Sequence, residues 1–240
     1  MKWKLAIALV VVLVVALVLI RRMNPMTTAL RTRELATRGL AAYLAERFSG
    51  QCAIVVSNPF TKEKGLPKPI YAQEEAGLKG LREGFDGRIT PVLMFPELKT
   101  EARQNPFGVS LPEGTSTPLS YLVADGSFDQ IAAQSRCDLI VSLIGLPADL
   151  HKLRVWDSAD KHVFALLLAD LRLVGDLDAL RTAVQSHKIV AFVLNKPGAP
   201  PEQAPFSGDW KAEFERRFLL VSVDNFEEIA HRFPQSFLTQ

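Results

Sequence analysis

The chain has 240 residues, of which 48% are hydrophobic and 22% are charged, and its formal net charge is +2. This composition is typical of a globular protein, and the length accommodates one large domain with an appendage. A net charge this small does not indicate a nucleic-acid-binding surface, so we expect no nucleic-acid partner.

An unbroken apolar run from Leu5 to Ile20 opens the chain, between Lys2 and Lys4 on one side and Arg21 and Arg22 on the other. A helix of this length extends about 24 Å, slightly less than a ~30 Å hydrocarbon core, and the flanking cations can reach the interface. A cleaved signal peptide would end in small residues, and a core helix would not be apolar on every face. We therefore predict an uncleaved membrane anchor.

The positive-inside rule taken alone slightly favours a cytoplasmic domain, because more positive residues follow the run than precede it. A short basic N-terminus followed by an apolar run nevertheless enters the export pathway and leaves the rest of the chain outside. We expect a single-pass membrane protein with an extracytoplasmic domain on the periplasmic side.

Three regions are predicted along the chain, a membrane anchor at 1–22, a juxtamembrane helix at 23–50 and an α/β domain at 51–240. The helix is indicated by Asn24-Pro25, which supplies an N-cap and a proline in the first turn. The sequence leaves open whether this helix forms a stalk or packs on the domain.

From Cys52 the chain alternates short apolar runs with helical patterns, which predicts a mostly parallel sheet covered on both faces. We expect a doubly wound, flavodoxin-like α/β fold of strand order 2-1-3-4-5. The predicted strands are Ala53–Ser57, Ile89–Phe95, Asp138–Leu143, Val163–Leu168, Ile189–Leu194 and Phe218–Val223. The predicted helices are Gln73–Phe85, Phe128–Ser135, Leu177–His187 and Asn225–Phe233.

Two of these strands share a pattern, since Cys52 precedes Ser57 by the same offset at which Cys137 precedes Ser142. In the order 2-1-3 the two strands are neighbours, so we predict equal register and cysteine Cα atoms within about 7 Å. A disulfide and two buried free thiols both fit, and we favour the thiols because free cysteine packs as a small hydrophobe. An extracytoplasmic location would permit the disulfide.

The segments that leave the predicted strands are long, at Asn58–Ala72, Pro96–Ser120 and Asn195–Gly208. They leave the C-terminal ends of parallel strands and therefore meet at one rim, where open α/β sheets bind ligands. Each polar residue there could also simply cap a turn or be solvated. The candidate ligand-binding residues at this rim are Ser57, Asn58, Thr61, Lys62, Ser142, Gly145, Asp170, Asn195 and Lys196.

Motifs for nucleotide binding, for zinc peptidases and for the nucleophile elbow of hydrolases are absent from the sequence. The four histidines are scattered and lack ligand-type neighbours at helical spacing. We predict no cofactor and no metal site, and we assign no catalytic residue.

The strand Cys52–Ser57, together with Glu74–Phe85 that opens the first crossover, resembles one lobe of a type 1 periplasmic binding protein. The resemblance covers about residues 50–195 and implies an extracytoplasmic α/β lobe. In that family two lobes close over a small ligand. This chain departs from the family because too little sequence follows the fifth strand for a second lobe, so no binding residue is carried over.

These patterns favour a membrane-anchored, non-enzymatic domain that docks onto a protein partner as an accessory subunit of a membrane-associated assembly, or binds a small solute at the rim. Docking is preferred, because a single lobe cannot close over a ligand. The alternative is a hydrolase or transferase that uses Ser142, Asp170 or Lys196. A deep pocket with converging polar groups would favour the enzyme, and a flat apolar rim would favour docking.

Overall fold

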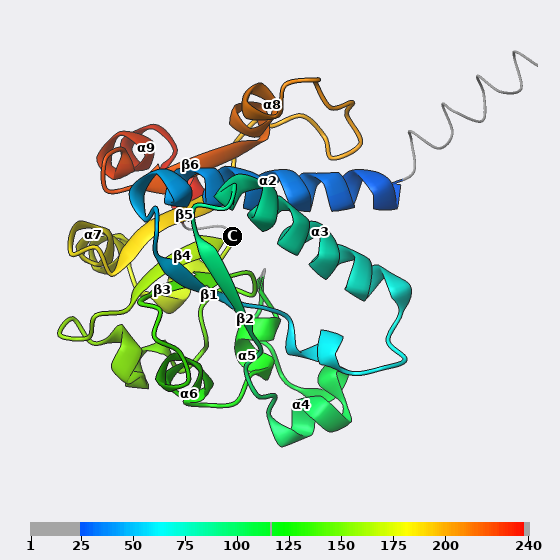
Figure 1. Cartoon of the computed structure of the whole chain (residues 1–240), viewed down its shortest axis with the longest axis vertical. Coiled ribbons are helices and arrows are strands. Elements are labelled where there is room, and N and C mark those ends of the chain that lie inside the picture. The colour runs from blue at the N-terminus through cyan, green and yellow to red at the C-terminus, as the bar shows by residue number, and fades with distance from the viewer. Residues whose placement is uncertain (1–24, 116, 238–240) are drawn as a thin grey trace, which may run out of the picture.

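The computed structural model describes residues 25–115 and 117–237. Its centre is a six-stranded sheet of order β2-β1-β3-β4-β5-β6, in which β6 alone runs antiparallel to its neighbour (Figure 1). The predicted order 2-1-3-4-5 is confirmed, with β6 added at the edge. The strands are β1 Cys52–Val56, β2 Thr90–Met94, β3 Leu139–Ser142, β4 Val163–Leu167, β5 Ile189–Asn195 and β6 Phe218–Ser222.

Helices cover both faces of the sheet, as expected for a doubly wound fold (Figure 1). One face carries α2 Pro25–Arg47, α3 Lys68–Phe85 and α8 Trp210–Arg217. The other face carries α6 Ser127–Ala133, α7 Leu177–Gln185 and α9 Phe226–Arg232. Two short helices, α4 Thr100–Gln104 and α5 Leu119–Leu122, lie in the long connection after β2. Single turns of 3-10 helix occur at Pro59–Lys62, Pro106–Gly108, Leu150–Lys152, Arg154–Trp156, Leu171–Leu173 and Pro234–Phe237.

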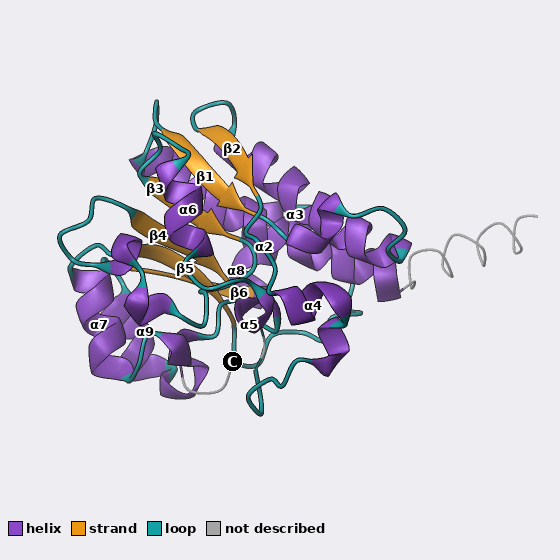
Figure 2. Cartoon of the chain, turned by 90° about the horizontal axis from the view of Figure 1, so that it is seen from below, coloured by secondary structure: helices purple, strands orange, loops and turns teal. Residues whose placement is uncertain are grey.

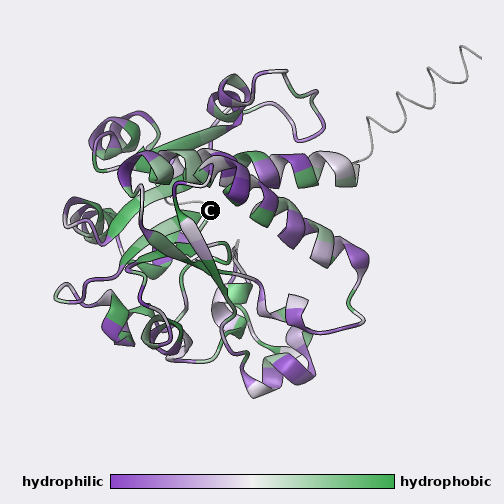
Figure 3. Cartoon of the chain, in the orientation of Figure 1, coloured by the Kyte–Doolittle hydropathy of each residue, from purple (hydrophilic) through white to green (hydrophobic). Residues whose placement is uncertain are grey.

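The two faces of the sheet differ in side-chain size, because successive strand residues point to opposite faces. Small residues face α2, among them Ala53, Ala165 and Ala191. Large residues such as Ile54 and Phe192 point to the face that carries α6, α7 and α9. Figure 3 shows the strands as mostly hydrophobic ribbons between helices of mixed character. The small residues allow α2 to pack closely on the sheet.

The helix α2, which the sequence left open as a stalk or a packed element, is packed. Its apolar side chains, such as Leu40 and Leu44, are fully buried against the sheet. It also crosses α3 at very short range, since a Cβ atom at Gly80 would lie 2.1 Å from the carbonyl oxygen of Glu34. Glycine at this position is therefore what permits the contact between the helices.

The two cysteines form a disulfide bond, with their Cα atoms 5.2 Å apart, so the favoured prediction of two buried free thiols was wrong. This separation lies within the predicted limit of about 7 Å. The register is shifted by one residue from the predicted equal register, because Val56 and not Ser57 pairs with Ser142. Cys137 lies in the turn before β3, so the matching offsets of the two cysteine and serine pairs do not determine the pairing of the strands.

The predicted anchor at Leu5–Ile20 lies outside the described residues. Within 25–115 and 117–237, no helix combines the length and the apolarity needed to cross a membrane.

Candidate functional site

A cavity of about 390 Å³ lies at the C-terminal ends of β1, β3 and β4. The chain leaves β1 towards α3 on one face of the sheet and enters β3 from α6 on the other, so this is the topological switch point where open α/β sheets bind ligands. The cavity is lined by Arg33, Asn58, Ile70, Gln73, Glu74, Thr117, Pro118, Leu119, Leu143, Ile144, Leu167 and Leu168.

A buried polar network forms one side of this cavity. The carboxylate of Glu74 accepts hydrogen bonds from the hydroxyl of Ser57 and, at 3.3 Å, from the backbone N–H of Asn58. Its second oxygen lies 3.4 Å from Nη2 of Arg33, which also donates to the carbonyl oxygen of Leu143 at 3.4 Å. Both oxygens of Glu74 are therefore engaged, and the carboxylate orients the arginine.

The guanidinium of Arg33 is only partly satisfied by these contacts. Its Nε is buried and has no hydrogen-bond partner within the described part of the chain. Burial lowers the pKa of Arg33, and the charge and hydrogen bond of Glu74 oppose that shift. An unpaired buried donor costs about 1–3 kcal/mol. This unpaired donor belongs to a residue that lines the cavity.

Strained backbone forms another part of the cavity wall. Leu168, directly after β4, has φ +44°, a conformation that L-residues with large side chains rarely adopt. Such a residue costs on the order of 1–3 kcal/mol and is concentrated at ligand sites and switch regions. Its N–H still donates to the carbonyl oxygen of Val193 at 3.1 Å. The turn at Leu168 thus ends the strand and places its side chain on the cavity.

The structure brings some of the sequence-predicted residues to the cavity and leaves others beside it. Asn58 lines the cavity and Ser57 supports it through Glu74. Ser142 donates to the carbonyl oxygen of Gly145 at 2.6 Å, and Gly145 has φ +84°. These two residues shape the turn after β3 but do not line the cavity.

Asp170 is fully buried and pairs with Arg172, whose Nη2 lies 2.6 Å from a carboxylate oxygen. Arg172 also donates to the carbonyl oxygen of Gly114 at 3.0 Å. Burial, with the negative charge of Asp170, raises the pKa of the nearby Tyr121. Asp170 therefore holds the segment after β2 against the rim and does not reach the cavity.

Thr61 and Lys62 lie on the outer side of the rim. The hydroxyl of Thr61 donates to the carbonyl oxygen of Asn58 at 2.6 Å. The ammonium of Lys62 lies 5.7 Å from the ring centre of Phe95. Both interactions stabilise the turn after β1, and neither side chain lines the cavity.

Asn195 and Lys196 are turned away from the cavity as well. Asn195 ends β5 in an exposed position and pairs with Phe218 of β6. Lys196 donates through Nζ to the carbonyl oxygen of Glu215 at 2.7 Å. The end of the segment that follows lines a hollow together with α2, and side chains of α8 donate hydrogen bonds to the segment.

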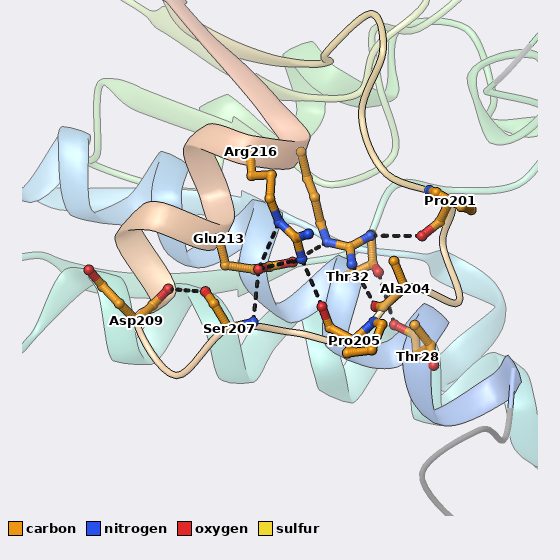
Figure 4. A network of polar contacts seen from close by, with 10 residues as sticks. Thr28, Thr32, Pro201, Ala204, Pro205, Ser207, Asp209, Glu213 and Arg216 are labelled. Carbon is orange, nitrogen blue, oxygen red and sulfur yellow. Dashed lines mark hydrogen bonds and ion pairs between the residues drawn. The ribbon is translucent and has the colours of Figure 1, made fainter.

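A charged network on α8 holds this segment in place (Figure 4). Glu213 is 1% exposed and accepts hydrogen bonds from the side chains of Arg216 and Arg217 and from the backbone N–H of Ser207. The two arginines also donate to backbone carbonyl oxygens of the segment, at Pro201, Ala204 and Pro205. The segment Asn195–Gly208 is thus tied down by internal contacts.

The residues proposed for an enzyme do not converge, since Ser142, Asp170 and Lys196 bond to three different partners. Sequence analysis missed Arg33 and Glu74, the two charged residues that line the cavity. The spacing of Glu74 could have indicated its burial, because Glu74 lies three residues before Gly77 and seven before Leu81, on the buried face of the same helix.

No known protein family matches the sequence, and no curated protein sequence matches it. Several solved structures are similar. One is a sugar-binding protein of a sugar ABC transporter from Bacillus halodurans, with 12% identity, a TM-score of 0.43, and coverage of 82% of this chain and 64% of that one. Another is GanP, a glucose-galactose binding protein from Geobacillus stearothermophilus, with 11% identity, a TM-score of 0.38, and coverage of 83% and 54%.

A third similar structure is the XylFII-LytSN complex, with 8% identity, a TM-score of 0.43, and coverage of 80% of this chain and 60% of that one. The chain therefore spans less than two thirds of the length of each of these three proteins.

Proposed function

We propose that this protein is a membrane-tethered domain that binds a small molecule in the cavity at the C-terminal rim of its sheet. The tether is the apolar run Leu5–Ile20, and the domain lies on the extracytoplasmic side of the membrane. The observation that carries the proposal is the cavity itself, in which Arg33 has an unpaired buried donor held in place by Glu74.

A single lobe can bind a ligand here because other parts of the same chain cover the rim. Thr117, Pro118 and Leu119 form one wall of the cavity, and they belong to the long segment after β2. Helices α2 and α3 supply the opposite wall through Arg33 and Glu74. A volume of about 390 Å³ is within the range of small-molecule sites.

The proposal predicts that the native protein carries a small molecule that a cavity-filling substitution removes. Gln73→Trp places a large ring in the cavity from α3, whereas Glu75→Trp places the same ring on the exposed side of that helix. Native mass spectrometry of the full chain is expected to show a bound small molecule in the wild type and in Glu75→Trp. In Gln73→Trp its occupancy is expected to fall at least about tenfold.

The same spectra test the tether, because a retained anchor requires an intact mass that includes residues 1–22. An intact mass that corresponds to a chain beginning near residue 23 would contradict the membrane tether. An adduct that persists in Gln73→Trp would show that the small molecule binds outside the cavity. A wild type without any adduct would contradict the binding of a small molecule.

Docking onto a protein partner is a second candidate function, and one feature favours it. Phe107 is 97% exposed and Leu111 37% exposed, both in the segment after β2. Large apolar side chains exposed on one segment can form an interaction site.

If this segment binds a partner, Phe107→Ser is expected to lower the yield of a specific cross-linked complex in native membranes by about tenfold, as for a binding hot spot. The matched control is Leu93→Ser, which removes a 41% exposed apolar side chain on the edge strand β2. Equal yields from both variants would argue against docking through Phe107.

A further inference from the structure

We propose that the ligand of the rim cavity is an amphipathic small molecule, with a single anionic head group bound by Arg33 and an apolar chain lying against the leucine and isoleucine wall. This inference rests on the proposed function and specifies the chemical class of the ligand.

The apolar part of the ligand follows from the composition of the wall. Most of the lining side chains are aliphatic, and they are Ile70, Pro118, Leu119, Leu143, Ile144, Leu167 and Leu168. None of the described lining residues is aromatic, and the backbone N–H of Asn58 donates to Glu74, which pairs with Arg33. A solute with hydroxyl groups on every side would leave most of them unpaired against this wall. Each methylene buried there instead raises affinity about fourfold.

The anionic head group follows from the hydrogen bonds of Arg33. The hydrogen bonds of its guanidinium use Nη2, with both acceptors at 3.4 Å, and leave the buried Nε unpaired within the described residues. Ser57 and Asn58 both donate to Oε1 of Glu74, and Oε2 of Glu74 lies 3.4 Å from Nη2 of Arg33. A carboxylate or phosphate can accept two parallel hydrogen bonds from a guanidinium, which a single hydroxyl cannot do.

The location of the cavity agrees with a ligand that partitions into membranes. Arg33 lies at the cavity, and α2 begins eight residues earlier at Pro25, so its first turns extend about 12 Å from the cavity on the same side. Figure 2 shows the arrowheads of β1 and β2 pointing towards the side on which α2 and α3 begin. The start of α2 and the rim that bears the cavity therefore lie on the same side of the domain.

The inference is tested by photolabelling the full chain in nanodiscs of zwitterionic lipid, with a decanoic acid analogue that carries a diazirine at the end of its chain. We expect label on peptides that contain the cavity wall, such as those with Leu143 or Leu168. Decanoate is expected to displace the label at least about ten times more effectively than decanol or butyrate, which lack the charge and the chain respectively.

Two variants test the role of Arg33. Arg33→Gln removes the cation and is expected to reduce labelling at least about tenfold, whereas Arg31→Gln removes an exposed cation of the same helix outside the cavity and should leave labelling unchanged. Gly77→Ala keeps the cation but places a Cβ atom 3.1 Å from Nε of Arg33, and it improves the helix propensity of α3. Gly77→Ala is therefore expected to weaken labelling in a folded protein, even if Arg33→Gln does not fold.

Equal displacement by decanoate and decanol would overturn the anionic head group, and equal displacement by butyrate would overturn the apolar chain. Label confined to residues outside the cavity, or unchanged labelling of Gly77→Ala, would overturn the inference as a whole. If the mass spectra show a different small molecule that Gln73→Trp removes, the proposed function stands and this inference fails. If neither experiment detects a ligand, both fail.

Discussion

Replacing Glu213 with glutamine is expected to lower the free energy of unfolding by about 3–5 kcal/mol, the cost of breaking a buried ion pair from one side. Glu213 is 1% exposed, and Arg217, which donates to it, is 4% exposed. The substitution leaves the guanidinium of Arg217 buried with only the carbonyl oxygens of the loop before α8 as partners. The loss is measured by urea titration of the full chain in detergent micelles.

The same pair makes stability depend on pH. Burial raises the pKa of Glu213, but hydrogen bonds from Arg216, the N–H of Ser207 and Arg217 outweigh burial and lower the pKa from 4.5 to about 2. A carboxylate with a lowered pKa stabilises the folded state above pH 4.5, and this contribution disappears as the pH falls to about 2. The difference of pKa corresponds to about 3 kcal/mol. The difference in the free energy of unfolding between the wild type and Glu213→Gln should therefore decrease as the pH falls from 4.5 to about 2.

Glu215→Gln is the matched control, because Glu215 lies on the same helix with its side chain exposed. We expect it to change stability by less than about 0.5 kcal/mol. A Glu213→Gln protein as stable as this control at neutral pH would show that the network does not hold the loop in place.

Replacing Gly80 with alanine is expected to destabilise the fold by about 3 kcal/mol, at the upper end of the cost of overpacking. The added Cβ would lie 2.1 Å from both the carbonyl oxygen of Glu34 and the hydroxyl of Thr37. One of these atoms is backbone of α2, so relief requires α2 and α3 to move apart. The gain in helix propensity, about 1 kcal/mol, is too small to compensate.

Gly77→Ala on the same helix serves as the comparison, because its new Cβ meets the side chain of Arg33 at 3.1 Å and not a backbone atom. We expect its stability to be within about 1 kcal/mol of the wild type. Thermal unfolding of both variants distinguishes the two cases. Equal stability of Gly80→Ala and Gly77→Ala would mean that α2 and α3 are not packed as closely as described.

The strands of the sheet were largely predictable, because a buried parallel strand is a short apolar run between turn signals. Both ends of each of the six observed strands lie within one residue of the predicted run. The helix α8 was not predicted, since most of Trp210–Arg217 is charged and polar. Its buried side chains include Glu213 and Arg217, which pair with each other. A helix whose buried side chains are a charged pair has no regular spacing of apolar residues from which it could be predicted.

The candidate site was predicted in location but only partly in its residues. The rule that ligands bind at the C-terminal ends of parallel strands led to Asn58 and Ser57, which follow β1 directly. Arg33 and Glu74 belong to helices. A helical residue reaches the rim only if it lies on the helix face that packs on the sheet and at the level of the C-terminal ends of the strands. Those quantities depend on how α2 crosses α3, which the spacing of apolar residues does not give.

By itself the sequence determined the doubly wound sheet, its strand order, the proximity of the two cysteines and the rim at which the cavity lies. Each of these follows from local patterns and from the few topologies that short connections permit. Only the tertiary structure decided the strand register, the packing of α2, the course of the loop before α8 and the pairing of Arg33 with Glu74. The reason is that these features depend on contacts between side chains far apart in the chain, such as Gly80 against Glu34, whose geometry no local pattern specifies.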